Sequence, residues 1–549
     1  MITKLLGVPF WVLETDISPD KLTNTAIEEQ LKLIDLFWLS RENYNTKWEN
    51  NEEIQIKYFD YLARNKFINE TQVDKIEYVN KITNYLVEIG LLTLNRRLSN
   101  AGKHLLNIVT SNEFTSNNFL KISKDSFIYL KQLLKTSYSG EGLTIRPLII
   151  LIKLILELNY LTIDEFEILL PLCTTKNSTE CILKNIFKLR EKKEPFDKFA
   201  LKSVIGNNTI AIDIFQKTYK SNKNLLIKYF SLTEIFSFDK NVIKLTKLAE
   251  AYFKNCIHLL YLEAFSTNAL LNQEAKLNKI TNFKDYSEDK LLPELSRLLH
   301  KNITSIKEAY SLIAFENINK FNTLANGYYE NSKLLDVLIN IAEGKGEFIE
   351  EYLSKGVSLD DILKYFVEII WYKVNHKIYN IFDLTTVSLT SNLRPRSHIN
   401  QINKPLILNY SKTECYPKHD VLIYTYVTKS TEETNDKLIL AISNFQHYQL
   451  QNMNSHNYAI FIANNINKAT LRTIREQLYQ TFCDPFNTYI KVKGLRIIPL
   501  KFTDLFEIYN SNFFYEELFK LFDEASNSTE FDPEFWYNEL KNELIRKQI

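Results

Sequence analysis

The sequence is poor in the residues that cross-link a chain or interrupt its regular structure. Its cysteines are scattered without the spacing of a metal-ligand set, at Cys173, Cys181, Cys256, Cys415 and Cys483. We expect reduced thiols rather than a disulfide framework. Glycine (11) and proline (12) are scarce, whereas Leu, Ile, Lys, Glu and Asn are abundant, which favours a mostly helical protein.

Long apolar runs are also missing. The most apolar segment, Leu148 to Leu158, contains Lys153 and Glu157 and is shorter than the roughly 20 residues that a membrane helix needs, so we expect a buried core helix. The short apolar patch from Leu5 to Val12 is not followed by a longer apolar region or a cleavage motif, so a signal peptide is not expected. The chain is therefore predicted to be soluble and cytoplasmic, with no membrane partner.

An excess of charge of one sign is absent as well. The formal net charge of +1 neither requires nor excludes a nucleic-acid partner, so any basic face has to be local. Apolar material is plentiful: 45% hydrophobic and 13% aromatic residues suffice for packed cores and exclude disorder of the whole chain. A length of 549 residues suggests three or four domains.

The first half of the chain carries one local pattern twice. After three predicted helices, residues 91–106 read as a strand, a tight basic turn and a capped helix. Residues 231–245 repeat this order, with turn residues between two alternating runs and a helix directly after them. Helices followed by a β-hairpin are the parts of a winged helix. We therefore predict two winged-helix-like domains, residues 1–140 and 141–258, that bind double-stranded DNA.

Basic residues are the candidate DNA contacts. Arg96 and Arg97 lie in the first predicted turn, where a wing would meet DNA, although ordinary solvent-facing side chains would give the same pattern. The other candidates are Lys103, Arg146, Lys240, Arg394 and Arg396. Contacts to phosphates would hold the register on the duplex, and a few contacts to base edges would read its sequence.

The second half begins with charged helical sequence and continues with alternating strands and helices. Residues 259–357 predict a helical linker. In residues 358–549, apolar runs such as Val421 to Lys429 and Tyr458 to Ala463 are separated by helical segments, which predicts an α/β sheet layer. The expected fold class is thus a multidomain, mostly α protein with α/β parts.

Several phrases together resemble the AlwI-like family of type IIS restriction and nicking endonucleases. Each phrase is weak alone, but together they are fairly specific and span most of the chain: Leu98-Ser99-x-Ala101-Gly102-Lys103, Arg146-Pro147-Leu148, Phe461-Ile462-Ala463 and Arg496-Ile497-Ile498-Pro499-Leu500. The resemblance implies two DNA-recognition domains, a helical linker and a C-terminal PD-(D/E)xK-like α/β nuclease fold that uses Mg²⁺.

The same resemblance places the expected metal ligands of the family on unsuitable residues. The metal-binding Asp position falls on Leu406 and the strand Glu position on Tyr426. Neither side chain can bind Mg²⁺ as a carboxylate does. Glu368 and His447 match the helix Glu and the His of the family site and would be its remnants, although both could equally be solvent-facing, and His398 matches a loop His. No metal ligand is assigned.

Three functions stay open at this point. The leading hypothesis is a sequence-specific DNA-binding protein with a degenerate nuclease fold, serving as a cleavage-deficient subunit beside a catalytic nuclease chain and a cognate methyltransferase. The second is an active Mg²⁺-dependent type IIS endonuclease or nickase whose carboxylates have relocated, with Asp420 and Glu433 as candidates. Only this case requires Mg²⁺ as a cofactor. The third is a helical scaffold that does not bind DNA, which the near-zero net charge leaves open.

Overall fold

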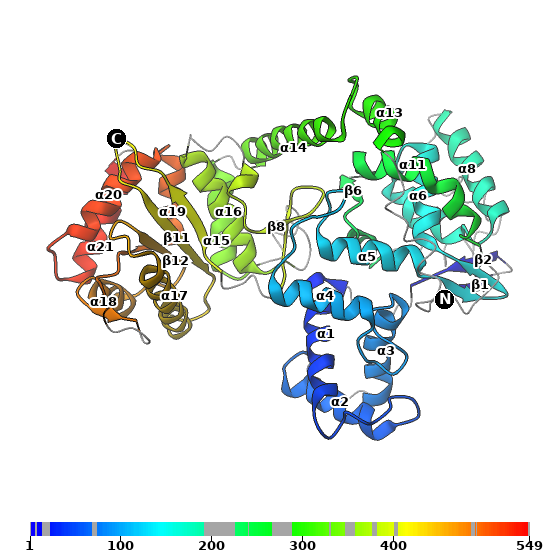
Figure 1. Cartoon of the computed structure of the whole chain (residues 1–549), viewed down its shortest axis with the longest axis horizontal. Helices are drawn as coiled ribbons and strands as arrows, with labels where there is room; N and C mark the ends of the chain where they lie inside the picture. The colour runs from blue at the N-terminus through cyan, green and yellow to red at the C-terminus, as the bar shows by residue number, and fades with distance from the viewer. Residues whose placement is uncertain are drawn as a thin grey trace. The chain divides into compact units, whose positions relative to one another are not determined.

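The structure is a computed structural model that describes residues 2–5, 8–13, 22–68, 74–191, 225–239, 241–265, 288–328, 331–345, 357–375, 381–399, 404–484, 489 and 491–546. It contains two compact units (Figure 1). The first unit comprises Met1–Ile313 with the segments Thr390–Asn392 and His398–Asn400, and the second comprises Ala314–Leu389, Leu393–Ser397 and Gln401–Ile549. The finer division predicted at residues 140, 258 and 357 stays a prediction.

The first unit opens with a small hairpin and a run of helices. Its first elements are β1 (Ile2–Leu5), β2 (Val8–Trp11), α1 (Asn24–Leu39), α2 (Glu52–Arg64), α3 (Lys75–Glu88) and α4 (Asn100–Ser111). Local capping fixes where these helices begin, because the side chains of Thr23, Asn51, Asp74 and Ser99 each accept a backbone N–H of the first turn.

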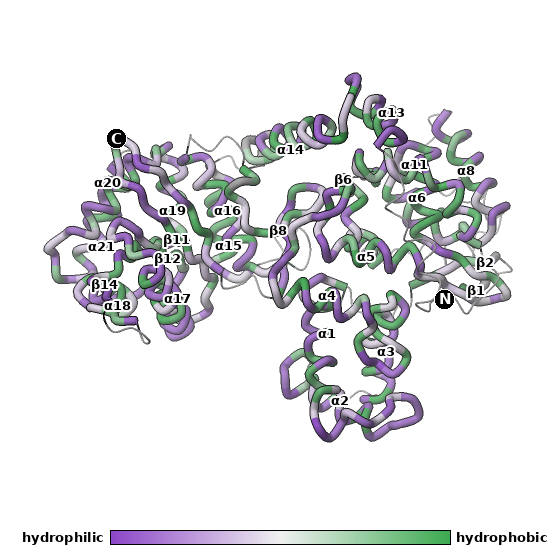
Figure 2. Tube along the Cα trace, in the orientation of Figure 1, coloured by the Kyte–Doolittle hydropathy of each residue, from purple (hydrophilic) through white to green (hydrophobic). Residues whose placement is uncertain are grey.

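The rest of the first unit is helical with short strands. Its elements are α5 (Lys124–Lys135), β3 (Tyr138–Gly140), β4 (Leu143–Ile145), α6 (Pro147–Leu158), β5 (Leu161–Thr162), α7 (Ile163–Leu169), η2 (Leu170–Leu172), α8 (Lys176–Glu191), β6 (Phe236–Asp239), β7 (Val242–Leu245), α11 (Lys247–Leu262) and α13 (Glu288–Leu299). Helix α6 is the apolar segment expected to be a core helix. Its apolar residues are buried except for the partly buried Leu156, and it is mostly green in Figure 2. None of the described helices is long and apolar enough to cross a membrane.

The two predicted hairpin-and-helix phrases differ in the structure. The second is a regular antiparallel hairpin, β6–β7, which joins β5 in a three-stranded sheet and is followed by α11. The first is an isolated antiparallel bridge between Leu92 and Leu98, followed by α4. The order of turn and helix was predicted correctly, whereas the strands of the first hairpin were overestimated. The winged-helix assignment stays a prediction.

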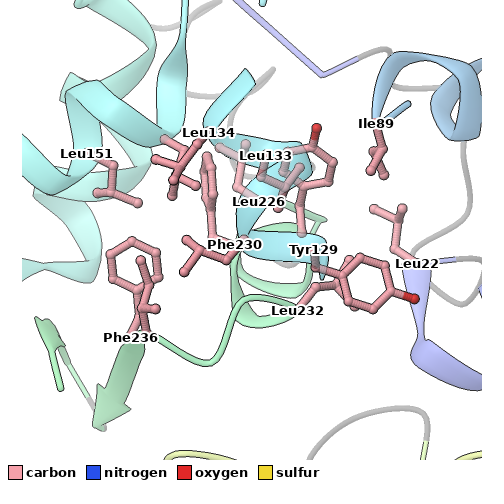
Figure 3. Packing of buried hydrophobic residues seen from close by; sticks show 14 of the residues in the cluster. Leu22, Ile89, Tyr129, Leu133, Leu134, Leu151, Leu226, Phe230, Leu232 and Phe236 are labelled. Carbon is pink, nitrogen blue, oxygen red and sulfur yellow. The ribbon is translucent and has the colours of Figure 1, made fainter. Parts of the chain in front are cut away.

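One hydrophobic core runs through the first unit. Figure 3 shows Ile89, Tyr129, Leu151, Phe230 and Phe236 among side chains of one cluster, although they come from segments far apart in the sequence. Their relative exposures are all 2% or less. The two parts predicted as separate recognition domains therefore share a continuous packed interior.

The second unit begins with helices and ends with a helix-covered sheet. Helix α14 (Ile306–Tyr328) spans the division between the units. The elements that follow are α15 (Asn331–Ala342), α16 (Leu359–Val374), η6 (Ile381–Asp383), β8 (Ser388–Leu389), β9 (Pro395–Arg396), β10 (Leu406–Tyr410), β11 (His419–Tyr426), α17 (Thr431–Asn452), β12 (Tyr458–Ala463), α18 (Lys468–Gln477), β13 (Thr481–Cys483), β14 (Lys491–Lys493), β15 (Ile497–Leu500), α19 (Phe502–Asn510), α20 (Tyr515–Asn527) and α21 (Pro533–Arg546).

A four-stranded mixed sheet organises the second unit. Its strand order is β10-β11-β12-β15, in which β10 runs antiparallel to β11 and the other neighbours run parallel. One face of the sheet packs against α16, α19 and α20, and the other packs against α17, α18 and Trp536 of α21. This arrangement confirms the α/β layer expected from the sequence, and its two faces define where candidate site residues can meet.

Candidate functional site

Leu406 and Tyr426 lie on opposite faces of the four-stranded sheet. Leu406 begins β10 opposite Ile423 and packs in the cluster that includes α16. Tyr426 ends β11 and packs in the other cluster, with its ring centroid 5.8 Å from that of Phe461. Both are only 1% exposed. Because side chains alternate across a strand, Leu406 shares its face with Thr425 and not with Tyr426.

A row of charged residues on α16 lies along that shared face. Asp360, Lys364 and Glu368 are four residues apart and therefore project from one side of the helix; we call them the α16 stripe. The backbone N–H of Val427 donates to Asp360 Oδ1 at 2.7 Å, and Lys364 Nζ donates to the Lys404 carbonyl at 3.0 Å. These contacts place the stripe beside the start of β10 and the end of β11.

Glu368 is buried rather than solvent-facing, with an exposure of 1%. Its Oε1 accepts hydrogen bonds from Thr386 N and Thr386 Oγ1, both at 2.7 Å, and from Val387 N at 3.3 Å. Its Oε2 has no hydrogen-bond partner among the described residues. Burial raises the pKa of Glu368 to about 7, against the opposing influence of the Lys364 ammonium. The carboxylate therefore holds the segment after η6 in place.

Lys364 brings a positive charge into the same buried region. Its exposure is 6%, and burial lowers its pKa, whereas the carboxylates of Glu368 and Asp361 raise it. A bound divalent cation would provide the same kind of charge beside a buried carboxylate. The ammonium of Lys364 and the carboxylate of Glu368 therefore favour each other's charged form in this buried region.

Asp360 lies at the other end of the stripe, where the Glu433 carboxylate influences it electrostatically. Burial raises the pKa of Asp360 to about 6, the Val427 N–H and Lys437 lower it, and Asp361 and Glu433 raise it further. Glu433 is already engaged as a helix cap, because its Oε2 accepts the Lys429 N–H at 2.7 Å. Within the part of the chain that the structure describes, no three His, Cys, Asp or Glu side chains are grouped to hold a metal ion.

The second relocation candidate, Asp420, lies at the opposite end of β11. Its Oδ1 accepts from Asn409 Nδ2 at 2.7 Å, and its Oδ2 accepts from the Tyr448 hydroxyl at 3.0 Å. Six residues of extended strand separate it from Tyr426, which corresponds to about 20 Å. Asp420 and Glu433, which follows β11 in the first turn of α17, therefore do not contribute to one metal site.

The two histidines named by the resemblance lie in different surroundings. His447 is exposed on α17, where its Nε2 accepts from Gln451 Nε2 at 2.9 Å. His398 is fully buried in the first unit, bonded through Nδ1 to Glu28 and stacked on Phe114 at a centroid distance of 3.8 Å. His398 is thus a core residue of the first unit and not part of the four-stranded sheet.

Three of the arginines predicted to contact DNA are buried. Arg96 is 8% exposed, donates from Nε to Thr83 Oγ1 at 2.9 Å and lies 5.7 Å from the Trp48 ring. Arg146 is 3% exposed and pairs with Glu263 at 3.1 Å. Arg396 is 7% exposed. Buried guanidinium groups such as these support the protein interior and cannot reach a phosphate without unpacking.

The remaining predicted contacts differ in accessibility. Arg97 is half-buried, donates from Nη2 to the Tyr44 carbonyl at 2.6 Å and lies 4.3 Å from the Trp38 ring. Arg394 is partly exposed, and Lys240 lies outside the described residues. Lys103 of α4 is exposed to solvent. Of the basic residues predicted from the sequence, Lys103 is therefore the one best placed to meet DNA.

Helix α4 presents a polar face that sequence reasoning did not recognise as a unit. The exposed residues at helical spacing are Asn100, Lys103, His104, Asn107 and Thr110, which we call the α4 face. These side chains include the amide, ammonium and hydroxyl groups that bind phosphates and base edges. The signal in the sequence was the capping Ser99 followed by polar residues at spacings of three and four.

Comparison with known protein families places most of these elements in one family. The family model for the AlwI restriction endonuclease matches residues 87–508, a range that extends from α3 into α19 and includes the α4 face, the α16 stripe and the whole four-stranded sheet. A search of curated proteins found no match.

Proposed function

Because the chain belongs to the AlwI restriction endonuclease family, we propose that it binds double-stranded DNA at a specific sequence and does not cut the DNA by itself. In this proposal it is the recognition or partner subunit of a restriction system. A separate nuclease chain supplies the cut, and a cognate methyltransferase protects the host sequence.

The observation that carries the loss of cleavage is the composition of the site beside α16. Metal-dependent hydrolysis needs carboxylates that hold Mg²⁺ and activate water next to the phosphate. Leu406 and Tyr426 provide no carboxylate, and they point to opposite faces of the sheet. On the face of Leu406, Lys364 already contributes a cation beside Glu368. This environment supports a stable fold rather than a metal centre.

The DNA-binding part of the proposal rests on the α4 face together with the family. Lys103 lies in the first turn of α4, where the positive end of the helix dipole also favours phosphates. Asn100, His104 and Asn107 lie on the same exposed side and can donate to base edges. A recognition helix of this kind fits the major groove of duplex DNA.

Two assays on the purified full chain test the proposal. Selection from a randomised duplex library should enrich one motif, and gel shifts on that motif should weaken linearly with the logarithm of salt concentration. The same protein with Mg²⁺ or Mn²⁺ should leave a supercoiled plasmid that contains the motif intact. Cleavage that disappears in a Glu368→Gln variant would refute the loss of catalysis, and failure to retain any duplex would support the scaffold hypothesis.

The alternative of an active enzyme has one specific observation in its favour. Burial raises the pKa of Asp360 to about 6, and the Glu433 carboxylate raises it further. If this pair bound a metal, any plasmid cleavage would be lost in Asp360→Asn and retained in Asp420→Asn. The second variant is the matched control because Asp420 lies at the far end of β11.

A further inference from the structure

A pocket of about 870 Å³ lies in the second unit where β12 and β15 begin. Its walls come from the turn after α17, the end of α18, strand β14, Arg496, and the residues from Asp523 to Phe531. The strands β11 and β12 run parallel, so this is the opposite end of the sheet from Tyr426 and the α16 stripe. The pocket is therefore separate from the degenerate nuclease-like site.

The turn that forms one wall of the pocket is held rigidly by amide side chains. Gln449 Nε2 donates to the Asn454 carbonyl at 3.1 Å, and Asn457 Nδ2 donates to Gln449 Oε1 at 3.0 Å. Asn454 Nδ2 donates to the Lys418 carbonyl at 2.8 Å. These bonds keep Met453 at a φ of +46°, a conformation that costs free energy for a residue other than glycine. The wall is thus fixed before any ligand arrives.

Close packing at Gly494 positions the opposite wall. This residue has a φ of +75°, and a Cβ there would lie 2.6 Å from the Leu478 carbonyl oxygen. Its N–H donates to the Gln480 carbonyl at 2.8 Å, which seats β14 on the end of α18. Lys493 precedes Gly494 directly, so the glycine also fixes where that lysine emerges.

The pocket carries uncompensated positive charge. Lys491 and Lys493 are alternate residues of β14, and both are exposed. Neither forms a salt bridge with any other described residue, whereas the Arg496 guanidinium at the pocket wall pairs with Asp523. Two lysines on one side of a strand, about 7 Å apart along it, match the spacing of successive phosphates in a nucleic-acid strand.

Two exposed aromatic rings lie at the same pocket. Tyr479 is 56% exposed and Phe531 is 80% exposed, and their rings are stacked at a centroid distance of 6.4 Å with an interplanar angle of 21°. The guanidinium of Arg475 lies 5.7 Å from the centroid of the Tyr479 ring, and Arg475 itself is 4% exposed. The two rings therefore form an aromatic surface that is largely exposed to solvent.

We propose that this pocket binds a short single-stranded segment of nucleic acid. Its phosphates contact Lys491 and Lys493, and its bases stack on Tyr479 and Phe531. Unpaired bases are required because a duplex covers the base faces that the rings would contact. The hydroxyl of Ser455 lines the pocket and can bind a base edge without strict sequence preference. This activity does not depend on sequence-specific duplex binding.

Fluorescence anisotropy of the full chain with a labelled oligothymidine of about ten nucleotides tests this proposal directly. Tyr479→Ala with Phe531→Ala should weaken single-strand binding by about tenfold or more, because each base stacked on an aromatic ring contributes substantially. Lys491→Ala with Lys493→Ala should weaken it and reduce the salt slope by about one to two units. All four side chains are exposed, so neither double variant should disturb folding.

Matched control variants lie outside the pocket. Phe535→Ala removes an aromatic ring that is 68% exposed, and Lys520→Ala removes an ammonium whose side chain is 79% exposed. Both should bind the oligothymidine as the wild type does. The proposal is overturned if the wild type does not bind the oligothymidine, if the pocket variants bind it normally, or if the controls lose as much affinity.

A parallel duplex assay separates this proposal from the function proposed above. The pocket variants should retain duplex binding at the selected motif. If the wild type binds no duplex while its single-strand binding is still lost in the pocket variants, the proposed recognition function fails and the pocket assignment stands. If duplex binding is normal and single-strand binding is absent, the pocket assignment fails alone.

Discussion

The two ends of the four-stranded sheet differ in what their charged residues can reach. At the end of β11, Lys364 and Glu368 of the α16 stripe are 6% and 1% exposed. At the start of β12 and β15, Lys491 and Lys493 project into solvent beside exposed aromatic rings. Lys364 and Glu368 interact with other protein groups, whereas Lys491 and Lys493 are accessible to a ligand in the pocket. A residue type that matches a functional motif therefore indicates a binding site only if its side chain is accessible to a ligand.

The difference follows from the cost of burying charge. An ionised carboxylate in the interior is stable only when hydrogen bonds and an opposite charge replace its water. Glu368 obtains both, from Thr386, Val387 and Lys364. The exposed lysines of β14 keep their water and have no such requirement. Variants at buried and exposed charged positions should therefore differ in their effects on stability and binding.

Replacing Lys364 with Met should produce the largest loss of stability. It leaves Glu368 without its buried counter-charge and removes the hydrogen bond to the Lys404 carbonyl. We expect a loss of about 4 kcal/mol in the free energy of unfolding near pH 8, measured by chemical denaturation. Lys491→Met, at the open end, should change stability by less than about 0.5 kcal/mol. Equal effects of the two variants would remove the distinction between the two ends.

Glu368 should make stability depend on pH. Burial raises its pKa from 4.5 to about 7, so between these values the unfolded state loses its proton first. The contribution of Glu368 is fully present below pH 4.5 and is lost as pH rises toward 7. Relative to Glu368→Gln, the wild type should lose about 3 kcal/mol across this window. If the difference in unfolding free energy between the wild type and Glu368→Gln did not change with pH, the Glu368 carboxyl group would not be buried away from water.

Metal binding should return only when carboxylates share a face of the sheet. Leu406→Asp with Thr425→Glu places two carboxylates beside α16, whereas Leu406→Asp with Tyr426→Glu splits them between faces. In thermal unfolding, Mn²⁺ at about 100 times its Kd should stabilise the first by about 2.7 kcal/mol. The second serves as the control, and stabilisation of both would contradict the assignment of faces.

The smallest effect concerns the same contrast in the first unit. Lys103→Ala on the α4 face should lower duplex affinity severalfold and reduce the salt slope by about one, with stability unchanged. Arg96→Ala should instead lower the unfolding free energy by about 2 kcal/mol, because it removes buried charge-assisted hydrogen bonds to Thr83 and Asn84. Gel shifts and chemical denaturation measure the two effects. If Lys103→Ala lowered only stability and Arg96→Ala lowered only duplex affinity, the assigned roles of the two residues would be wrong.

The secondary structure of several segments was predictable because their signals are local. Ser99 caps α4, the apolar residues of α6 form a core helix, and the turn after Asp239 closes the hairpin β6–β7. The strands β11 and β12 were visible as apolar runs. Local signals did not reveal that Arg96 turns inward, since a basic turn has the same sequence whether its guanidinium faces water or Trp48.

The sequence revealed only part of the candidate site, again because burial of a charged side chain cannot be read from local sequence. The absence of carboxylates at positions 406 and 426 could be read directly from the sequence. Nothing in the sequence, however, distinguishes Lys364 from the many other lysines on charged helices. Its burial beside Glu368 depends on how α16 packs against β10 and β11. The pocket with Tyr479 and Phe531 brings together residues that have no shared motif.

The sequence by itself determined the family, the helical content, the α/β layer and the absence of carboxylates at positions 406 and 426, because each depends on residue identity and local spacing. Only the tertiary structure decided which charged side chains are buried and which are exposed to solvent. Leu406 and Tyr426 diverge because strand register and alternation set the face of each side chain. Burial of Lys364, and exposure of Lys491, come from packing between distant segments, which no local pattern encodes.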